Sequence, residues 1–403
     1  MEIHGQEVVI VGCGLGTPAT LTVEAAEAVR SADRLIGPAR LLAALALPGV
    51  QQSERTSGPD VVAEVHAHPD ERIAILFPGD PGFFSSARTL ARELGSSVRI
   101  LPGVSAFSAL CDRLRIPEEE VRFLRADASA LEDIVYAVSR NPWSCIQTGQ
   151  RSSTHAVLTA LMEAGLGALR ASCGYALGQS DELLAEDTVD GLAQSDLPET
   201  AALLLSNPDW ARYTVIGLPD EAFFRGTVPM TKFEVRNIAA SKLEIAANDT
   251  VYDIGGGTGA VSIELSRRAY LGKVYAVERL PEALYLLNKN RRHLRAFNME
   301  IVAGEAPEAL KDLPAPDKVF IGGSGGRIGQ IIEAVHSANP QVTIVATAAT
   351  LETLSEARNA FEQHGCRTEV LQVNASRLVS RGNAFTMFQA INPVFVMIAR
   401  SPQ

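Results

Sequence analysis

The sequence predicts an α/β protein built from two domains. Each half of the 403-residue chain alternates short apolar runs, typical of buried strands, with segments of helical periodicity. Between the halves, residues 217–232 mix proline, glycine and charges without any period, which indicates a domain boundary. A glycine-rich loop follows the first strand of each half. We therefore expect domains at 1–222 and 223–403, each with a largely parallel sheet.

In the first half, predicted strands and helices follow one another closely. Strands are expected at 7–12, 72–77, 98–103 and 143–149, with later strands within 169–178 and 200–206. Helices are expected at 18–32, 85–95, 104–115 and 153–165.

The second half restarts the same alternation. Helices are expected at 231–244, 258–269 and 281–294, and strands at 250–255, 273–278, 299–305, 318–323 and 341–348. The tail, 384–400, carries two apolar runs separated by Asn392-Pro393, and we expect these runs to pair as an antiparallel edge.

Composition limits the function classes. The net charge of −11 argues against general nucleic-acid binding, and no apolar run approaches the length of a membrane span. The chain starts without a cleavage signal, so we expect a soluble, cytoplasmic protein. We also expect a homo-oligomer. Five separated cysteines and seven histidines show no spacing typical of a disulfide framework or a metal site, so we expect no metal.

The glycine loop at 253–259 is the strongest single signal. Asp253 ends a predicted strand, and Gly255, Gly257 and Gly259 follow at alternate positions, where the backbone can turn tightly beside a helix N-terminus. Glu278 ends the next strand, where a carboxylate can accept hydrogen bonds from a ribose diol. Gly255, Gly257 and Ala260 also form the G-x-G-x-x-A pattern of dinucleotide-binding proteins, so a nicotinamide cofactor is an alternative ligand. Asp253 favours S-adenosylmethionine, because a carboxylate suits the methionine ammonium better than a pyrophosphate.

From residue 229 onward the chain resembles the decarboxylating methyltransferase family of cobalamin synthesis. The segments that carry this resemblance are PMTKFEVR (229–236), DIGGGTGAVSIE (253–264), VYAVER (274–279), GEAPEAL (304–310) and VFIGGSGG (319–326). That family methylates C15 of precorrin-6B and removes the ring C acetate as carbon dioxide. The resemblance implies a Rossmann-like class I methyltransferase fold.

The resemblance also implies site residues. Those on the cofactor side are Asp253, Gly255, Gly257, Thr258, Gly259, Glu278, Gly304, Glu305 and Ala306. Those on the substrate side are Thr231, Lys232, Arg236 and Ser324. Corrin precursors are polyacids, so Lys232 and Arg236 are expected to pair with carboxylates.

The first half resembles the tetrapyrrole methyltransferase family, whose members hold S-adenosylmethionine between two α/β lobes. The resemblance rests on VGCGLGTPATLT (11–22), FPGDPGFFSS (77–86), LPGVSAFSAL (101–110) and ALGQSDE (176–182), and is greatest to the C5 methyltransferases of the same pathway. It departs from the family pattern at Leu15 and Pro78, where proline and serine are usual. It implies cofactor contacts from Gly79, Asp80, Pro81, Thr148 and Ala176, and substrate contacts from Gly12, Gly14 and Pro102.

Together the two resemblances imply a fused enzyme that methylates C5 and C15 of precorrin-6B and decarboxylates it, giving precorrin-8, with one S-adenosylmethionine site in each half. Methyl transfer from a sulfonium to an enamine carbon needs alignment more than a protein nucleophile, so we expect neither a catalytic cysteine nor a catalytic metal. The alternatives are methylation of another tetrapyrrole or of RNA, and a C-terminal NAD-dependent oxidoreductase.

Overall fold

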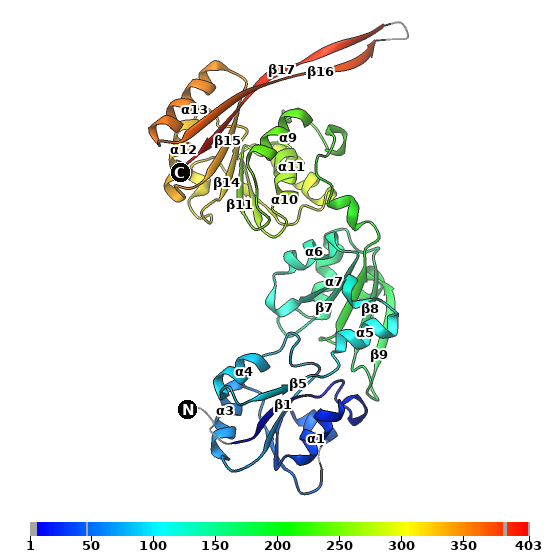
Figure 1. Cartoon of the computed structure of the whole chain (residues 1–403). Coiled ribbons are helices and arrows are strands. Elements are labelled where there is room, and N and C mark those ends of the chain that lie inside the picture. Colours follow the sequence, from blue (N-terminus) through cyan, green and yellow to red (C-terminus); the bar gives the residue numbers. More distant parts are fainter. Residues whose placement is uncertain (1–5, 46, 382–384, 402–403) are drawn as a thin grey trace. The chain divides into compact units, whose positions relative to one another are not determined.

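The computed structural model describes residues 6–45, 47–381 and 385–401 and divides into two compact units, Met1–Pro208 and Asp209–Gln403 (Figure 1). The predicted boundary after residue 222 lies 14 residues beyond this division (222 − 208). The backbone N–H groups of Gly217 and Leu218 donate to the Glu264 carboxylate, and Leu218 is buried in the core of the second unit. Residues just before 222 therefore pack with the second unit.

The first lobe of the N-terminal unit is a five-stranded parallel sheet of order β3-β2-β4-β1-β5. Its strands are β1 (Val8–Gly12), β2 (Arg34–Gly37), β3 (Gln51–Glu54), β4 (Ile73–Phe77) and β5 (Arg99–Leu101). Its helices are α1 (Val23–Ser31), α2 (Ala39–Leu45), α3 (Gly58–Ala67) and α4 (Ala87–Leu94). Apolar residues of α1 and α2 pack in one core cluster, and those of α3 and α4 in another, so both faces of the sheet are covered.

The second lobe has a mixed sheet of order β6-β7-β10-β8-β9. Its strands are β6 (Val121–Arg125), β7 (Trp143–Gln147), β8 (Arg170–Tyr175), β9 (Leu183–Thr188) and β10 (Ala202–Ser206). Its helices are α5 (Ala106–Leu114), α6 (Leu131–Arg140), α7 (Thr154–Glu163) and α8 (Val189–Ala193). In this sheet only β6 and β7 pair in parallel, whereas β10 lies antiparallel to both β7 and β8. The difference from a largely parallel sheet arises because β8 and β9 are joined without a crossover helix, which antiparallel pairing permits.

The C-terminal unit holds a seven-stranded sheet of order β13-β12-β11-β14-β15-β17-β16, in which the first five strands are parallel. These are β11 (Thr250–Ile254), β12 (Lys273–Glu278), β13 (Met299–Ala303), β14 (Lys318–Ile321) and β15 (Thr343–Ala348). The helices are α9 (Phe233–Lys242), α10 (Ala260–Arg268), α11 (Pro281–His293), α12 (Ile328–Ala338) and α13 (Leu351–Gln363). Helices α9 to α11 cover one face and α12 and α13 the other (Figure 1).

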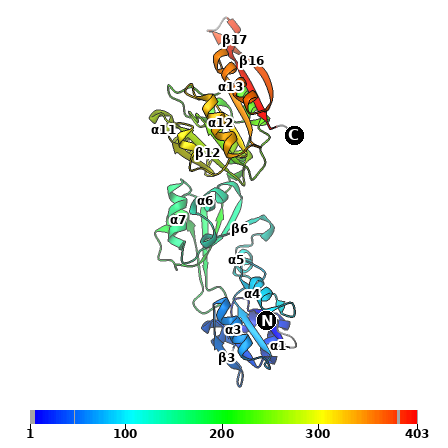
Figure 2. The same cartoon turned by 90° about the vertical axis from the view of Figure 1, so that its left-hand side faces the viewer.

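The tail corrects one prediction. Its two apolar runs do not pair with each other, because both belong to the single strand β17 (Phe385–Arg400), which pairs antiparallel with β16 (Arg367–Arg381). Asn392-Pro393 lies opposite the register shift between Val373 and Ala375, as expected for a proline that cannot donate to the ladder. Figures 1 and 2 both show this hairpin extending away from the sheet of its own unit.

Several helices begin at side-chain caps that the sequence supplies. The hydroxyls of Thr22, Ser105, Ser153 and Thr350 each accept a hydrogen bond from the backbone N–H three residues later. Short 3-10 turns complete the chain, at Pro18–Thr20, Glu118–Glu120, Ala126–Ala128, Trp210–Tyr213, Asp220–Ala222 and Glu308–Leu310.

In the described part of the chain, no helix combines the length and the apolar character that crossing a bilayer requires. Within the same residues, no group of three or more His, Cys, Asp and Glu side chains is placed to hold a metal ion. The five cysteines are free thiols, and all except Cys366 are buried.

Candidate functional site

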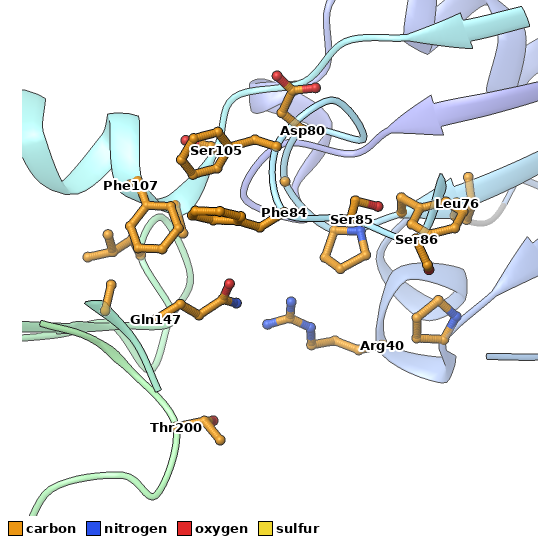
Figure 3. A pocket seen from close by; sticks show the side chains of 18 of the residues that line it. Arg40, Leu76, Asp80, Phe84, Ser85, Ser86, Ser105, Phe107, Gln147 and Thr200 are labelled. Atoms are coloured by element: carbon orange, nitrogen blue, oxygen red, sulfur yellow. The ribbon is translucent and has the colours of Figure 1, made fainter. Parts of the chain in front are cut away.

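A cavity of about 890 Å³ opens between the two lobes of the N-terminal unit (Figure 3). Its walls come from the carboxyl ends of β2 and β4 in the first lobe and of β6, β7 and β8 in the second. Ligands of α/β proteins bind at this end of the strands, because the loops there are free to face them. The turn at Gly79 lies in the wall of this cavity, whereas Gly12 and Gly14 do not line it.

The loop after β4 forms one wall of this cavity through its backbone. Gly79 has a φ of +70° and pairs with Gly14 as an isolated bridge, with N···O distances of 2.9 and 3.3 Å. The Asp80 carboxylate accepts a hydrogen bond of 2.7 Å from the N–H of Gly82 and so holds the turn closed. The turn is thereby fixed by its own residues, leaving main-chain atoms to face a ligand.

The glycines of the first lobe bring three loops into backbone contact. A methyl group added to Gly103 would lie 2.4 Å from the Gly79 carbonyl oxygen and 2.8 Å from the carbonyl carbon of Gly12. Neither atom belongs to a flexible side chain, so only glycine permits this approach. The loops after β1, β4 and β5 are therefore packed together at the floor of the site.

The structure brings four of the predicted N-terminal residues to the cavity wall: Gly79, Asp80, Thr148 and Ala176. Pro81 packs instead beneath Gly12, and Gly12 and Gly14 are themselves buried. Pro102 is exposed and is not one of the residues that line the cavity. The predicted substrate contacts of Gly12, Gly14 and Pro102 stay predictions, and the structure gives the two glycines a packing role.

Sequence reasoning missed the side chains that dominate this cavity. Arg40, Arg125 and Gln147 line it. Figure 3 shows Arg40 and Gln147 pointing into it, and Phe84 lies against Phe107 with ring centroids 6.1 Å apart. Phe84 has a φ of +48°, a conformation that bulky residues rarely adopt and that holds its ring at the cavity. Arg40 follows β2 and Arg125 ends β6, and neither strand was recognised in the sequence, so the signal for these two residues was lost.

A second, smaller cavity of about 260 Å³ lies in the C-terminal unit, at the carboxyl ends of β11, β12, β13 and β14. Seven predicted residues line it: Gly255, Gly257, Glu278, Gly304, Glu305, Ala306 and Ser324. Arg279, Leu280, Val228 and Pro229 complete the rim and were not predicted.

Backbone contact between two strand ends shapes this second cavity. Gly255, with a φ of +77°, approaches Gly323 so closely that an added methyl group would lie 2.6 Å from the Gly323 nitrogen. Gly259, also in the left-handed region, begins α10 immediately after the loop. Thr258 between them is buried, and its carbonyl accepts a hydrogen bond from Asn290. The loop is therefore preformed as a cradle beside a helix N-terminus.

Glu278 is held at the cavity by backbone donors. One carboxylate oxygen accepts from the Gly257 N–H at 2.9 Å, and the other accepts from Arg279 and Leu280 at 2.7 and 2.9 Å. The side chain is only 7% exposed, so its position is well defined. The carboxylate ties the glycine loop to β12, and its contact with a ribose stays a prediction.

Asp253 lies below the cradle rather than in the cavity wall. It is fully buried and accepts a hydrogen bond from the Ser262 hydroxyl. Burial raises the pKa of Asp253 to about 7; hydrogen bonds from Ser262 oppose this rise and the negative charge of Glu278 adds to it. The predicted contact of Asp253 with the methionine ammonium stays a prediction.

The prediction that Arg236 binds substrate carboxylates is wrong in this structure. Its guanidinium is completely buried, forms an ion pair of 3.1 Å with Asp220, and donates to the carbonyls of Thr231 and Leu218. A buried cation that is already paired has no path to a ligand. Thr231 and Lys232 are partly exposed at the start of α9, next to the segment that lines the cavity, and stay candidates.

Replacing Glu278 with alanine is expected to weaken donor binding at the C-terminal cavity about tenfold or more, because hydrogen bonds to a charged group are lost. Glu278→Gln keeps one oxygen acceptor, and its affinity for the donor is expected to fall less than that of Glu278→Ala. Calorimetric titration of the full chain with S-adenosylhomocysteine measures both variants. Unchanged affinity in Glu278→Ala, or an equal loss at the N-terminal cavity, would contradict the assignment.

Comparison with known proteins assigns each half to a family. Residues 222–400 match the model of the precorrin methyltransferase domain, and residues 7–193 match that of the tetrapyrrole (corrin/porphyrin) methylases. The chain is 40% identical over 190 residues to a probable cobalt-precorrin-6B C(15)-methyltransferase (decarboxylating) of Pyrobaculum calidifontis, covering 46% of this chain and 97% of that protein.

Other similarities extend over more of the chain or to solved structures. A precorrin-6Y C(5,15)-methyltransferase (decarboxylating) of a Sinorhizobium species is 27% identical over 351 residues, 85% of this chain and 84% of that protein. The crystal structure of precorrin-6Y C5,15-methyltransferase from Geobacter metallireducens is 40% identical, with a TM-score of 0.45, over 48% of this chain and all of that one.

Proposed function

Because the chain belongs to the decarboxylating precorrin methyltransferases of cobalamin biosynthesis, we propose that its halves are two methyltransferases that act on one corrin precursor. In this proposal residues 1–222 methylate C5 of precorrin-6B. Residues 223–403 methylate C15 and remove the ring C acetate as carbon dioxide, and the product is precorrin-8. The observation that carries the proposal is that each unit has its own glycine-loop cavity and matches its own methyltransferase family.

The C-terminal cavity suits S-adenosylmethionine. The Gly255 and Gly323 backbones form a cradle that a side chain would fill, and Glu278 presents a fixed carboxylate at the end of β12. We assign Glu278 to the ribose, and Gly304, Glu305 and Ala306 to the adenine side. Ser324, at the end of β14, faces the substrate in this proposal, and Thr231 and Lys232 lie near the entrance.

The N-terminal cavity is proposed to take a second molecule of the donor. The main chain at Gly79 and Ala176 and the buried Thr148 line the part of the cavity where the resemblance places it. At about 890 Å³, this cavity is within the size range of small-molecule sites and leaves room beside the donor for part of the substrate. A homo-oligomeric state remains a prediction.

The main contribution of the protein to this chemistry is to align the methyl donor with the substrate carbon. When bound, S-adenosylmethionine supplies a methyl group activated by the positive charge of its sulfonium. The macrocycle contributes a nucleophilic enamine carbon and an imine system that accepts the electron pair left by decarboxylation. Fixed loops such as the Gly255–Gly323 cradle orient the reactants, and orientation of this kind is worth about 7–11 kcal/mol.

Two donor sites per chain are the direct expectation. Titration of the full chain with S-adenosylhomocysteine in a calorimeter is expected to give a stoichiometry of two, with one affinity lost in Glu278→Ala and the other kept. A stoichiometry of one would contradict the proposal for whichever half fails to bind.

A further inference from the structure

The N-terminal cavity differs in charge from the rest of the molecule. Three arginines line it, Arg40, Arg55 and Arg125, and among the described residues Asp80 is the only acidic side chain in its wall. The whole chain carries a net charge of −11, whereas this wall keeps a positive excess even when Arg55 is counted with its partner Glu64: Arg40 and Arg125 against Asp80. Such a local excess concentrates anionic ligands at the cavity.

Arg40 and Arg125 approach the cavity from different lobes. Arg40 is in the first turn of α2, and Arg125 is the last residue of β6, beside Gln147 in the register of β6 and β7. Figure 3 shows Arg40 and Gln147 reaching toward one another across the cavity. Cationic and amide groups therefore face the same space from both sides.

The two guanidinium groups are available to a ligand. Both side chains are exposed. Within the described chain, neither Arg40 nor Arg125 donates a hydrogen bond or forms an ion pair. Arg55 is different, since it pairs with Glu64 at 3.2 Å and donates to the Glu54 carbonyl. Arg55 is thus held to its own lobe, whereas Arg40 and Arg125 keep all their donors free.

The C-terminal cavity has the opposite charge. Its wall contains Glu278, Glu305 and Arg279, and Arg279 lies 3.5 Å from the Glu305 carboxylate. An acidic wall suits a cationic donor but repels a polyanion. Recognition of an anionic substrate by side chains in the cavity wall is therefore concentrated in the N-terminal unit.

We propose that Arg40 and Arg125 are specificity residues of the N-terminal site that bind peripheral carboxylates of a tetrapyrrole polyacid. This inference rests on the proposed function and deepens it. Carboxylates accept two parallel hydrogen bonds from a guanidinium, so arginines in both walls select a ring with carboxylates on well-separated positions. The donor binds elsewhere in the cavity, through the main chain near Gly79 and Ala176.

Equilibrium binding to the full chain tests the assignment. The first probe is uroporphyrin I, a fully carboxylated tetrapyrrole, and the second is coproporphyrin I, which has fewer carboxylates. The absorbance of the porphyrin measures binding of either probe. Arg40→Gln and Arg125→Gln are each expected to raise the dissociation constant for uroporphyrin I about tenfold, because a charge-assisted contact is lost. Coproporphyrin I is expected to show a smaller loss, and Arg40→Lys to recover part of the affinity.

Arg122→Gln is the matched control. Arg122 is on the same strand, exposed, and outside the cavity wall; three positions from Arg125, it points to the opposite face of β6. Arg122→Gln removes the same charge as the cavity variants but leaves the cavity wall intact. Its affinity for uroporphyrin I is therefore expected to stay within about twofold of that of the unchanged chain. Binding of S-adenosylhomocysteine is expected to be unchanged in all these variants.

The inference would be overturned by equal losses in Arg122→Gln and the cavity variants, or by weakened S-adenosylhomocysteine binding with unchanged porphyrin binding. Absence of saturable porphyrin binding, with no change in the apparent KM for precorrin-6B in Arg40→Gln and Arg125→Gln, would overturn it as well. If the arginine effects appear but the unchanged chain does not methylate precorrin-6B, the carboxylate site stands and the proposed function fails.

Discussion

Replacing Arg236 with methionine is expected to destabilise the C-terminal unit by about 3–5 kcal/mol, since removing one partner of a buried ion pair leaves an uncompensated charge. Asp220, its partner, is almost completely buried. Burial opposes ionisation of Asp220, but the hydrogen bonds and charges of Arg236 and Arg377 outweigh it and keep its pKa below the usual value. Arg377, 3.1 Å from Asp220, is partly exposed and compensates only in part.

The measurement needs a signal from one unit, because a two-unit chain does not unfold in one step. The chain has two tryptophans, Trp143 in the N-terminal unit and Trp210 in the C-terminal unit. In a Trp143→Phe background, Trp210 fluorescence during denaturant unfolding reports on the C-terminal unit. Arg358→Met is the control, because Arg358 is exposed on α13 and its ion pair with Glu362 lies on the surface. Equal effects of the two replacements would contradict the structural role of Arg236.

Gly255→Ala is expected to abolish methyl transfer at the C-terminal site, and Gly103→Ala is expected to abolish it at the N-terminal site. At Gly255 the added methyl group meets the backbone of Gly323 at 2.6 Å, and at Gly103 it meets the Gly79 carbonyl oxygen at 2.4 Å. Backbone atoms cannot move aside without displacing the loop. A displacement of about 1 Å at an aligned site costs about 100-fold in rate.

The products distinguish the two variants. Gly255→Ala is expected to yield precorrin-6B with one added methyl group and no loss of carbon dioxide. Gly103→Ala is expected to yield a product with one added methyl group that has lost carbon dioxide. Mass spectrometry after a fixed reaction time measures both, and Gly58→Ala is a control, since an alanine there meets no atom within 4 Å and the backbone is not in the left-handed region. A variant that abolishes both methylations would show that the sites are not independent.

Local signals in the sequence were enough for the parallel strands of the C-terminal unit and for bringing most of its predicted site residues to one cavity. The loop at 253–259 and Glu278 combine glycine spacing with strand ends, and neighbouring parallel strands bring such ends together. Strand β2 was missed because its apolar run is only Leu35-Ile36, and β3 was missed because it is mostly exposed. Without β2 and β6, nothing in the sequence placed Arg40 and Arg125 in the wall of one cavity.

Arg236 shows the opposite failure. Its position in a helix with little amphipathic pattern is compatible with a solvated face, so the sequence predicted a surface cation. Its partner, Asp220, lies in a 3-10 turn 16 residues earlier, in a segment without any period. Burial of a charge is decided by such tertiary partners, which periodicity does not report.

Mass spectrometry of the product formed by the intact chain from metal-free precorrin-6B and S-adenosylmethionine tests the central claim most directly. The account predicts a product that has gained two methyl groups and lost one carbon dioxide. A product with one methyl group, or with two and the acetate retained, would contradict the assignment of two methyl transfers and a decarboxylation to this chain.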